Sequence, residues 1–139
     1  MIEAIERTLE LEVSPQDVWR ALTDPTEIAG WFGDTAELDA ELGSEGWFGW
    51  EGHGRAAVRV EEFEPITRLA WRWARAIDVA LEETRSTLVE WTLIPRDDGG
   101  TTLLLKESGF ERPEDREDNV GGWKKELQDL VEHLEKGGA

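Results

Sequence analysis

The chain of 139 residues contains no cysteine and no tyrosine. The absence of cysteine excludes disulfides and thiol chemistry. No stretch approaches the roughly 20 consecutive apolar residues that a membrane-spanning helix needs. The opening MIEAIERTLELEV lacks the basic, apolar and small-residue zones of a secretory signal peptide. We therefore expect a cytoplasmic protein without a membrane span.

Basic residues are scarce, because 15 Lys and Arg stand against 32 Asp and Glu and leave a formal net charge of −17. Such a charge repels phosphate backbones and anionic lipid surfaces, which argues against nucleic-acid binding as the main role. Asparagine, glutamine and methionine are also rare. A charged composition that avoids labile side chains is typical of heat-tolerant proteins, so we expect thermostability.

Familiar catalytic and metal-binding motifs are missing. The chain has no Walker loop and no dinucleotide fingerprint, and its glycine-rich GWEGHG lies between expected strands and not before a helix. His53 and His133 are the two histidines, and they lack ligand-like spacing, so we predict no metal and no cofactor. We expect His53 in a loop and His133 solvated near a helix end. No serine has the setting of a nucleophile, and we assign no catalytic residue.

The patterns that are present predict a strand, two short helices, about six further strands and a long C-terminal helix. A capping residue followed by proline opens each short helix, in the segments SPQDVWRAL and DPTEIAGWF. Residues 76–85 fit neither a strand nor a helix and suggest a loop over something apolar. Helices on one side of a meandering antiparallel sheet indicate an α+β class, in one domain over residues 1–139.

Two adjacent glycines, Gly121 and Gly122, precede Trp123 in the closing segment. Each glycine inside a helix costs about 1 kcal/mol relative to alanine. Three explanations are open. The glycines let the helix backbone approach the sheet, or they leave room for a ligand near a cavity mouth. Alternatively they mark a kink or a late helix start, with RPEDREDNV as a separate short turn.

Four segments, taken in order, resemble the START-like, or SRPBCC, superfamily: VSPQDVWRALTDPTEIAGWFGD, EFEPITRLAWRW, GGTTLLLKESGF and GGWKKELQDLVEHLE. They are most similar to the branch named for the activator of a heat-shock chaperone ATPase, over nearly the whole chain. The resemblance implies a helix-grip fold, in which a curved antiparallel sheet wraps a long C-terminal helix. It also implies a cavity of the kind that often holds a lipid-like or polyketide-like ligand.

Eight tryptophans are many for one small core, so we expect some of them to line that cavity. The expected walls are the large apolar side chains Trp31, Phe32, Trp71, Trp73, Trp91, Phe110, Val120, Trp123 and Leu127. We expect Trp50 to be more exposed, in the glycine-rich loop region. Arg72 and Glu90, on adjacent expected strands, form either an exposed ion pair or a polar anchor within the pocket.

Three functions follow as expectations. The first is the binding of a small hydrophobic molecule between the sheet and the C-terminal helix. The alternative is a protein-interaction module similar to the chaperone activator, whose acidic surface would meet a basic partner. The third is an enzyme of the cyclase or hydrolase kind. It needs a polar group with a shifted pKa inside the cavity, and the candidates are Arg72, Glu90 and His53.

Overall fold

The computed structural model describes residues 2–136. The elements are, in order, β1 (Ile5–Leu11), α1 (Pro15–Thr23), α2 (Pro25–Trp31), β2 (Thr35–Glu37), β3 (Glu45–Trp50), β4 (Gly54–Glu64), β5 (Arg68–Ala74), the short 3₁₀ helix η1 (Leu81–Glu83), β6 (Ser86–Pro95), β7 (Thr101–Ser108) and α3 (Pro113–Glu135). This order confirms the expected α+β class, with two short helices after the first strand and a long helix at the end.

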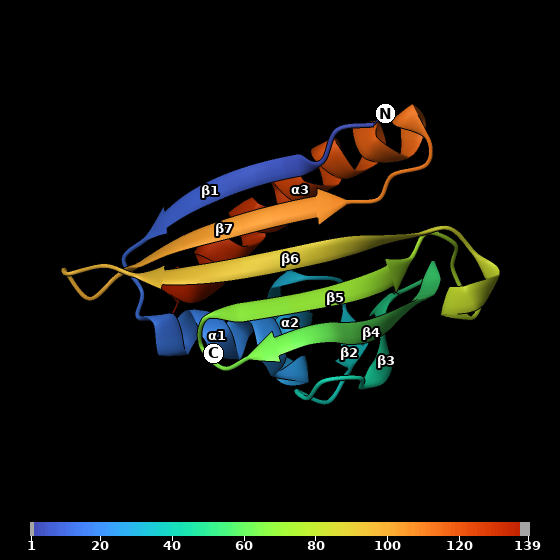
Figure 1. Cartoon of the computed structure of the whole chain (residues 1–139). Coiled ribbons are helices and arrows are strands. Elements are labelled where there is room, and N and C mark those ends of the chain that lie inside the picture. Colours follow the sequence, from blue (N-terminus) through green and yellow to red (C-terminus); the bar gives the residue numbers. More distant parts are fainter. Residues whose placement is uncertain (1, 137–139) are drawn as a thin grey trace.

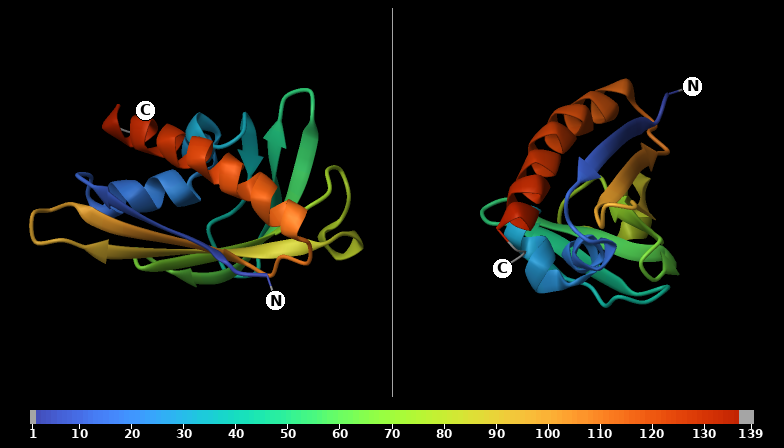
Figure 2. Two further views of the ribbon diagram at one scale, coloured as in Figure 1. Left: turned by 90° about the horizontal axis from the view of Figure 1, so that it is seen from above. Right: turned by 90° about the vertical axis from the view of Figure 1, so that its left-hand side faces the viewer.

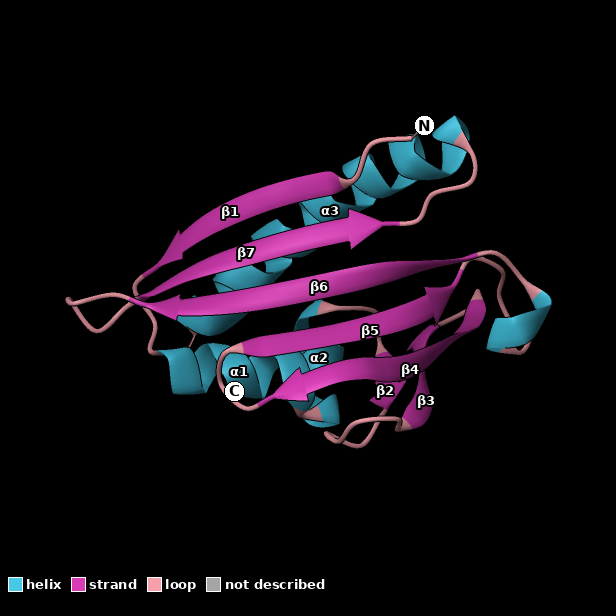
Figure 3. Ribbon diagram, viewed as in Figure 1, coloured by secondary structure: helices cyan, strands magenta, loops and turns pink. Residues whose placement is uncertain are grey.

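Over these residues the strands form one antiparallel sheet of seven, in the order β1-β7-β6-β5-β4-β3-β2. β1 pairs with β7, so that Ile5 lies opposite Glu107 and Leu11 opposite Thr101. β1, β7, β6 and β5 lie in front of α3, α1 and α2 in Figure 1, and the same arrangement is coloured by element type in Figure 3. The sheet curves around α3 in the two views of Figure 2, which confirms the helix-grip fold.

The short helices begin where their sequence signals predict. The Ser14 side chain accepts a hydrogen bond from the Asp17 amide at 3.2 Å and caps α1. Asp24 ends α1 and also caps α2, because its carboxylate accepts from the Thr26 amide at 2.9 Å. The indole of Trp31 then donates to the Ala21 carbonyl at 2.8 Å and ties the two helices together.

Helix α3 begins at Pro113, so the segment RPEDREDNV is not a separate turn. Pro113 occupies the first helical position, and Glu114 with Asp115 places negative charge in the first turn, where the helix dipole favours it. Gly121 and Gly122 therefore lie in the helix interior, and the explanation of a late helix start is wrong.

His133 is not solvated, contrary to the expectation. It is 8% exposed, and its Nε2 lies 2.7 Å from Oε1 of Glu27 in α2. A Cβ atom at Gly30 would come within 2.7 Å of the His133 ring, so the glycine at this position lets α2 cover α3 closely. The expectation failed because it placed His133 by its acidic sequence neighbours and not by the helix packed against it.

The loop between β5 and β6 contains η1, whose Leu81 is buried, in keeping with the expected loop over apolar surface. The core lies between the concave face of the sheet and the helices, and Trp71 and Trp91 are among its fully buried side chains. Within residues 2–136, no helix has both the length and the apolar character needed to cross a membrane.

Candidate functional site

A pocket of about 220 Å³ lies between α3 and the sheet. Trp73 from β5, Thr87 from β6, and Asn119, Trp123 and Glu126 from α3 are among its lining residues. Phe32, Trp50 and Phe110 complete much of its apolar wall. The site is thus assembled from segments far apart in the sequence, and the curvature of the sheet over α3 brings them together.

Three aromatic rings form a parallel group in the wall. Phe32 and Trp73 lie 5.4 Å apart between centroids at an interplanar angle of 21°, and Phe32 and Trp123 lie 5.9 Å apart at 27°. Trp73 and Trp123 are 5.6 Å apart at 22°. Trp50 meets the edge of this group, with its ring 5.6 Å from that of Phe32. Offset stacking of this kind stabilises the rings against each other, and all three residues line the pocket.

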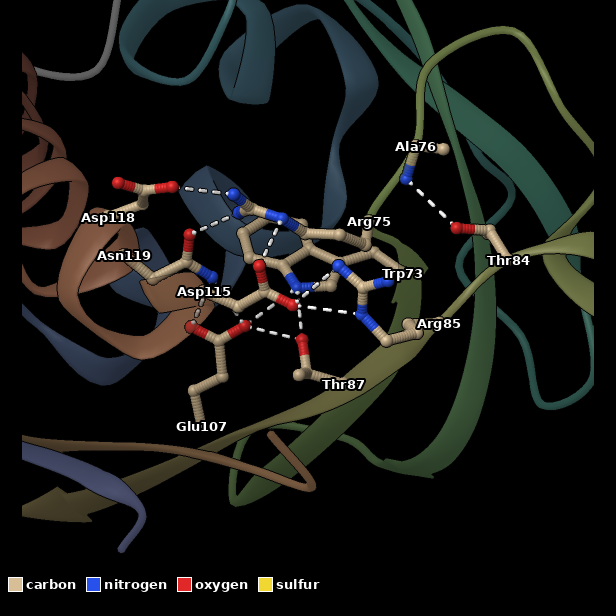
Figure 4. Close-up of polar contacts among 10 residues, drawn as sticks. All are labelled: Trp73, Arg75, Ala76, Thr84, Arg85, Thr87, Glu107, Asp115, Asp118 and Asn119. Atoms are coloured by element: carbon tan, nitrogen blue, oxygen red, sulfur yellow. Dashed lines mark hydrogen bonds and ion pairs between the residues drawn. The ribbon is translucent and has the colours of Figure 1, made fainter. Parts of the chain in front are cut away.

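The side chain of Glu107 is fully buried behind this aromatic wall. Its Oε1 accepts from the indole of Trp123 at 2.7 Å, and its Oε2 accepts from the indole of Trp73 at 2.9 Å. The Asn119 amide donates to both oxygens at 3.0 and 2.9 Å, and the Thr87 hydroxyl donates to Oε2. Trp73, Thr87 and Asn119 converge on Glu107 in Figure 4. These bonds offset the cost of burying the carboxyl group and fix both indole planes.

Ion pairs close one side of the pocket. Asp115 on α3 lies 3.2 Å from Arg75 Nε and 2.9 Å from Arg85 Nη2. Arg75 also reaches Asp118 at 2.7 Å. The two arginines approach α3 from the sheet side in Figure 4, one just after β5 and the other just before β6. The network joins the ends of these two strands to the first turns of α3.

Glu126 lies near the middle of α3 and lines the pocket. Its Oε2 is buried, and within the described part of the chain no donor reaches it. Burial raises the pKa of Glu126 to about 7, against the opposing charge of Lys125 and with a smaller contribution from Asp129. A carboxyl group that titrates near neutrality in an apolar pocket is a candidate for contact with a ligand.

The structure brings part of the expected wall together. The expected residues that line the pocket are Phe32, Trp73, Phe110 and Trp123. The remaining five belong to the surrounding core or pack against it: Trp31, Trp71, Trp91, Val120 and Leu127. Trp50 is more exposed than Trp123, as expected, but it lies at the end of a strand and not in the loop itself. Trp50 is the last residue of β3, and it is half-buried and lines the pocket.

Arg72 and Glu90 lie on the other face of the sheet, because the neighbouring Trp71 and Trp91 point into the core. Arg72 Nε is bonded to Glu61 at 3.2 Å, and Glu90 to Arg68 at 3.1 Å. They therefore do not pair with each other and do not anchor a ligand in this pocket. His53, the remaining candidate for an enzyme, is exposed in the turn between β3 and β4.

The sequence reasoning missed Glu107, Asn119 and Glu126, although a signal for each was present. Glu107 follows Leu103 and Leu105 at alternate positions of β7, so it shares their inward face. Asn119 and Glu126 are spaced four and three residues from Trp123, which places them near the same face of α3. Periodicity indicates which face points inward, but it does not show which polar residues on that face are buried.

Across residues 2–136, no group of three or more His, Asp or Glu side chains is arranged to hold a metal ion.

Known proteins resemble the chain in sequence and in fold. A family model described as "Activator of Hsp90 ATPase homolog 1-like protein" matches residues 12–135. Protein MLL2253 from Mesorhizobium loti is 25% identical with a TM-score of 0.81, over 96% of this chain and 98% of that one. No curated protein matches the sequence.

Two further solved structures share the fold. DynU16, assigned to the dynemicin biosynthetic locus, is 24% identical with a TM-score of 0.83, over 99% of this chain and 49% of its own. Aha1 from Colwellia psychrerythraea, solved in solution as a dimer, is 20% identical with a TM-score of 0.81, over 99% of this chain and 100% of that one. Since the family model covers most of the sequence and the helix-grip fold agrees with it, the chain belongs to the Activator of Hsp90 ATPase homolog 1-like family of the START-like superfamily, whose members often bind hydrophobic ligands.

Proposed function

We propose that the protein binds a small hydrophobic molecule, of the polyketide-like or lipid-like kind, in the pocket between α3 and the sheet. The pocket combines an aromatic wall with a few polar groups, which is the usual composition of a small-molecule site. The position of DynU16 in a biosynthetic locus for a natural product supports the polyketide-like class for this fold.

The volume of the pocket limits the size of the ligand that fits inside it. An apolar cavity of about 150 Å³ holds one benzene ring, so a pocket of about 220 Å³ has space for a molecule of one or two fused rings. A longer acyl chain or a larger ring system would extend out of the pocket. We therefore favour an aromatic ligand, or a larger one that inserts one end.

The main support for this proposal is the position of Gly122. It lines the pocket, and a Cβ atom built there would have no described atom within 4 Å. Gly122 is also exposed, so it lies at the mouth of the pocket, where a longer side chain would narrow the entrance. The alternative, that the glycines allow close approach to the sheet, has no support, since a Cβ atom at Gly121 also meets open space.

The adjacent glycines provide a matched pair of variants. Gly122→Leu directs a side chain toward the pocket, whereas Gly121→Leu makes the same change beside it, at a residue that does not line the pocket. Tryptophan fluorescence is titrated with flavonoids, steroid-like probes and fatty acids, because Trp50, Trp73 and Trp123 all lie in the wall. We expect saturable quenching that Gly122→Leu abolishes and Gly121→Leu preserves. Absence of saturable quenching by every probe, or equal losses in both variants, would contradict the proposal.

A second candidate rests on the family and on charge. The family is described by an activator of a chaperone ATPase, and this chain carries a formal net charge of −17. A chaperone partner with a basic patch would bind it electrostatically, and that binding should weaken as salt rises. Affinity capture with the full chain at low and high salt tests this candidate. Failure to retain a chaperone at low salt would reject it.

A further inference from the structure

The Glu126 carboxyl group is an incomplete hydrogen-bonding site within the proposed ligand pocket. Its Oε2 is buried, and no donor among residues 2–136 lies within bonding distance of it. A buried acceptor without a donor destabilises a folded protein, so native structures contain few of them. Glu126 is half-buried and lines the pocket, so a small rotation of its side chain would turn this oxygen toward a bound molecule that supplies the missing donor.

The other acidic groups of the pocket do not offer such a site. Asp115 is held by Arg75 and Arg85 at 3.2 and 2.9 Å. Glu111 is exposed to solvent, where water serves as its partner. Glu107, behind the wall, accepts bonds on both oxygens. Glu126 is therefore the acidic group to which a ligand would add a bond without displacing an existing partner.

We propose, on the basis of the function proposed above, that the ligand is an aromatic molecule bearing a hydroxyl group, and that this hydroxyl donates a hydrogen bond to Oε2 of Glu126. The aromatic part would lie against Trp73, Trp123 and Phe32, which line the same pocket. The bond from a hydroxyl to a carboxylate in an apolar setting is charge-assisted and stronger than one between neutral groups.

A hydroxyl group also suits the protonation behaviour of this carboxyl. Burial raises the pKa of Glu126 to about 7, so both forms are present near neutral pH. A hydroxyl donates to the ionised form and accepts from the protonated form, whereas a ligand carboxylate would be repelled by the ionised form. The pocket therefore favours phenol-like molecules over fatty acids.

Three probes with one ring system test this choice: 2-naphthol, 2-methoxynaphthalene, which lacks the donor, and 2-naphthoate, which is an anion. Their dissociation constants are measured at pH 7 by following the indole N–H signals of Trp73 and Trp123 in ¹H–¹⁵N NMR spectra. We expect 2-naphthol to bind about tenfold more tightly than 2-methoxynaphthalene, which is the effect of one hydrogen bond to a charged group. We expect 2-naphthoate to bind most weakly.

Glu126→Leu removes the acceptor and keeps a side chain of similar length, and Glu132→Leu makes the same change at an exposed position of α3. The preference for 2-naphthol should fall to within about twofold in Glu126→Leu, with 2-methoxynaphthalene still bound, and should remain in Glu132→Leu. Equal affinities of 2-naphthol and 2-methoxynaphthalene for the unmodified protein would overturn this inference and leave the pocket proposal standing. An undiminished preference in Glu126→Leu would overturn it as well. Binding of none of the probes would overturn both proposals.

Discussion

Two pairs of tryptophans on the concave side of the molecule differ in how their polar atoms are treated. Trp71 and Trp91 are fully buried in the core, and within residues 2–136 neither indole N–H finds an acceptor. Trp73 and Trp123 lie nearby, with Trp73 two residues along the same strand, and both indoles donate to Glu107. One pair serves as apolar bulk, and the other is held in a fixed orientation.

The difference coincides with the position of the pocket. Trp73 and Trp123 line it, whereas Trp71 and Trp91 do not. A core needs volume, and the indoles of Trp71 and Trp91 supply it, although each unpaired N–H lowers the stability of the fold. A binding wall also needs defined ring planes, and directional hydrogen bonds define them. The buried carboxyl of Glu107 is thus explained by the pocket better than by stability, since burying it is costly without these donors.

The largest effect is expected for Trp123→Ala, which removes a ring from the wall and a donor from Glu107. Truncation of a large buried aromatic side chain costs about 3–5 kcal/mol of the free energy of unfolding. Trp50→Ala is the control, because Trp50 lines the same pocket but is only half-buried. Thermal and urea unfolding measure both. Equal small losses would show that Trp123 does not connect α3 to the sheet.

Glu107→Leu is expected to cost about 3 kcal/mol, because it leaves the donors of Trp123 and Asn119 unpaired at about 1–3 kcal/mol each, partly offset by removal of a buried polar group. The Trp73 indole keeps its second acceptor, the Thr87 hydroxyl at 2.8 Å. Glu107→Gln keeps one acceptor and should cost less. The indole N–H signals of Trp73 and Trp123 should also shift and broaden in the Leu variant. A Leu variant as stable as the unmodified protein would mean that the network does not hold the wall.

The two tryptophans on β5, Trp71 and Trp73, belong to different pairs. The variants Trp73→Phe and Trp71→Phe therefore compare the two pairs directly. Both changes remove similar ring volume from buried positions, but the first also removes a hydrogen bond to Glu107. We expect Trp73→Phe to lower the free energy of unfolding by about 1.5 kcal/mol more than Trp71→Phe does. Urea unfolding of both variants measures the difference, and a larger loss for Trp71→Phe would reverse the comparison.

The smallest effect concerns Glu126 and pH. Burial raises the pKa of Glu126 from 4.5 to about 7, so the folded state binds more protons than the unfolded state between these values. The free energy of unfolding should therefore contain a component that falls as pH rises from about 4.5 to about 7. Glu126→Gln removes this component. After allowance for partial exposure, we expect this variant to be more stable than the unmodified protein by about 1 kcal/mol at pH 8, and to gain less at pH 5.

Glu132→Gln, a change at an exposed site of the same helix, is the control for this pH dependence. It should leave the pH profile of unfolding close to that of the unmodified protein. A profile that stays unchanged in Glu126→Gln would show that the carboxyl group is solvated.

The sequence predicted the fold in detail because local signals and the family resemblance agreed. Capping residues at Ser14 and Asp24 defined the short helices, and the large apolar side chains expected on the inside include Trp71, Trp73 and Trp91, which are all buried. The resemblance supplied the arrangement of the sheet around α3, which local patterns do not contain.

The pocket was less predictable, for a physical reason. Periodicity shows which side chains point inward but not where inward side chains fail to fill the space, so core and wall tryptophans look alike in the sequence. Glu107 and Glu126 are acidic residues among many, and only their neighbours across the sheet and helix distinguish them. The placement of His133 failed for the same reason, since Glu27 and Gly30 are distant in sequence.

Helix α3 is attached to the rest of the molecule near both of its ends. Asp115 is held by Arg75 and Arg85, and His133 is held by Glu27. The glycine pair lies between these attachments, and Gly122 lines the pocket. Asn119 and Trp123 flank the two glycines, and both donate hydrogen bonds to Glu107 on β7. The helix is therefore held at its middle as well as near its ends, so a ligand entering the pocket would meet a wall that is fixed at three points.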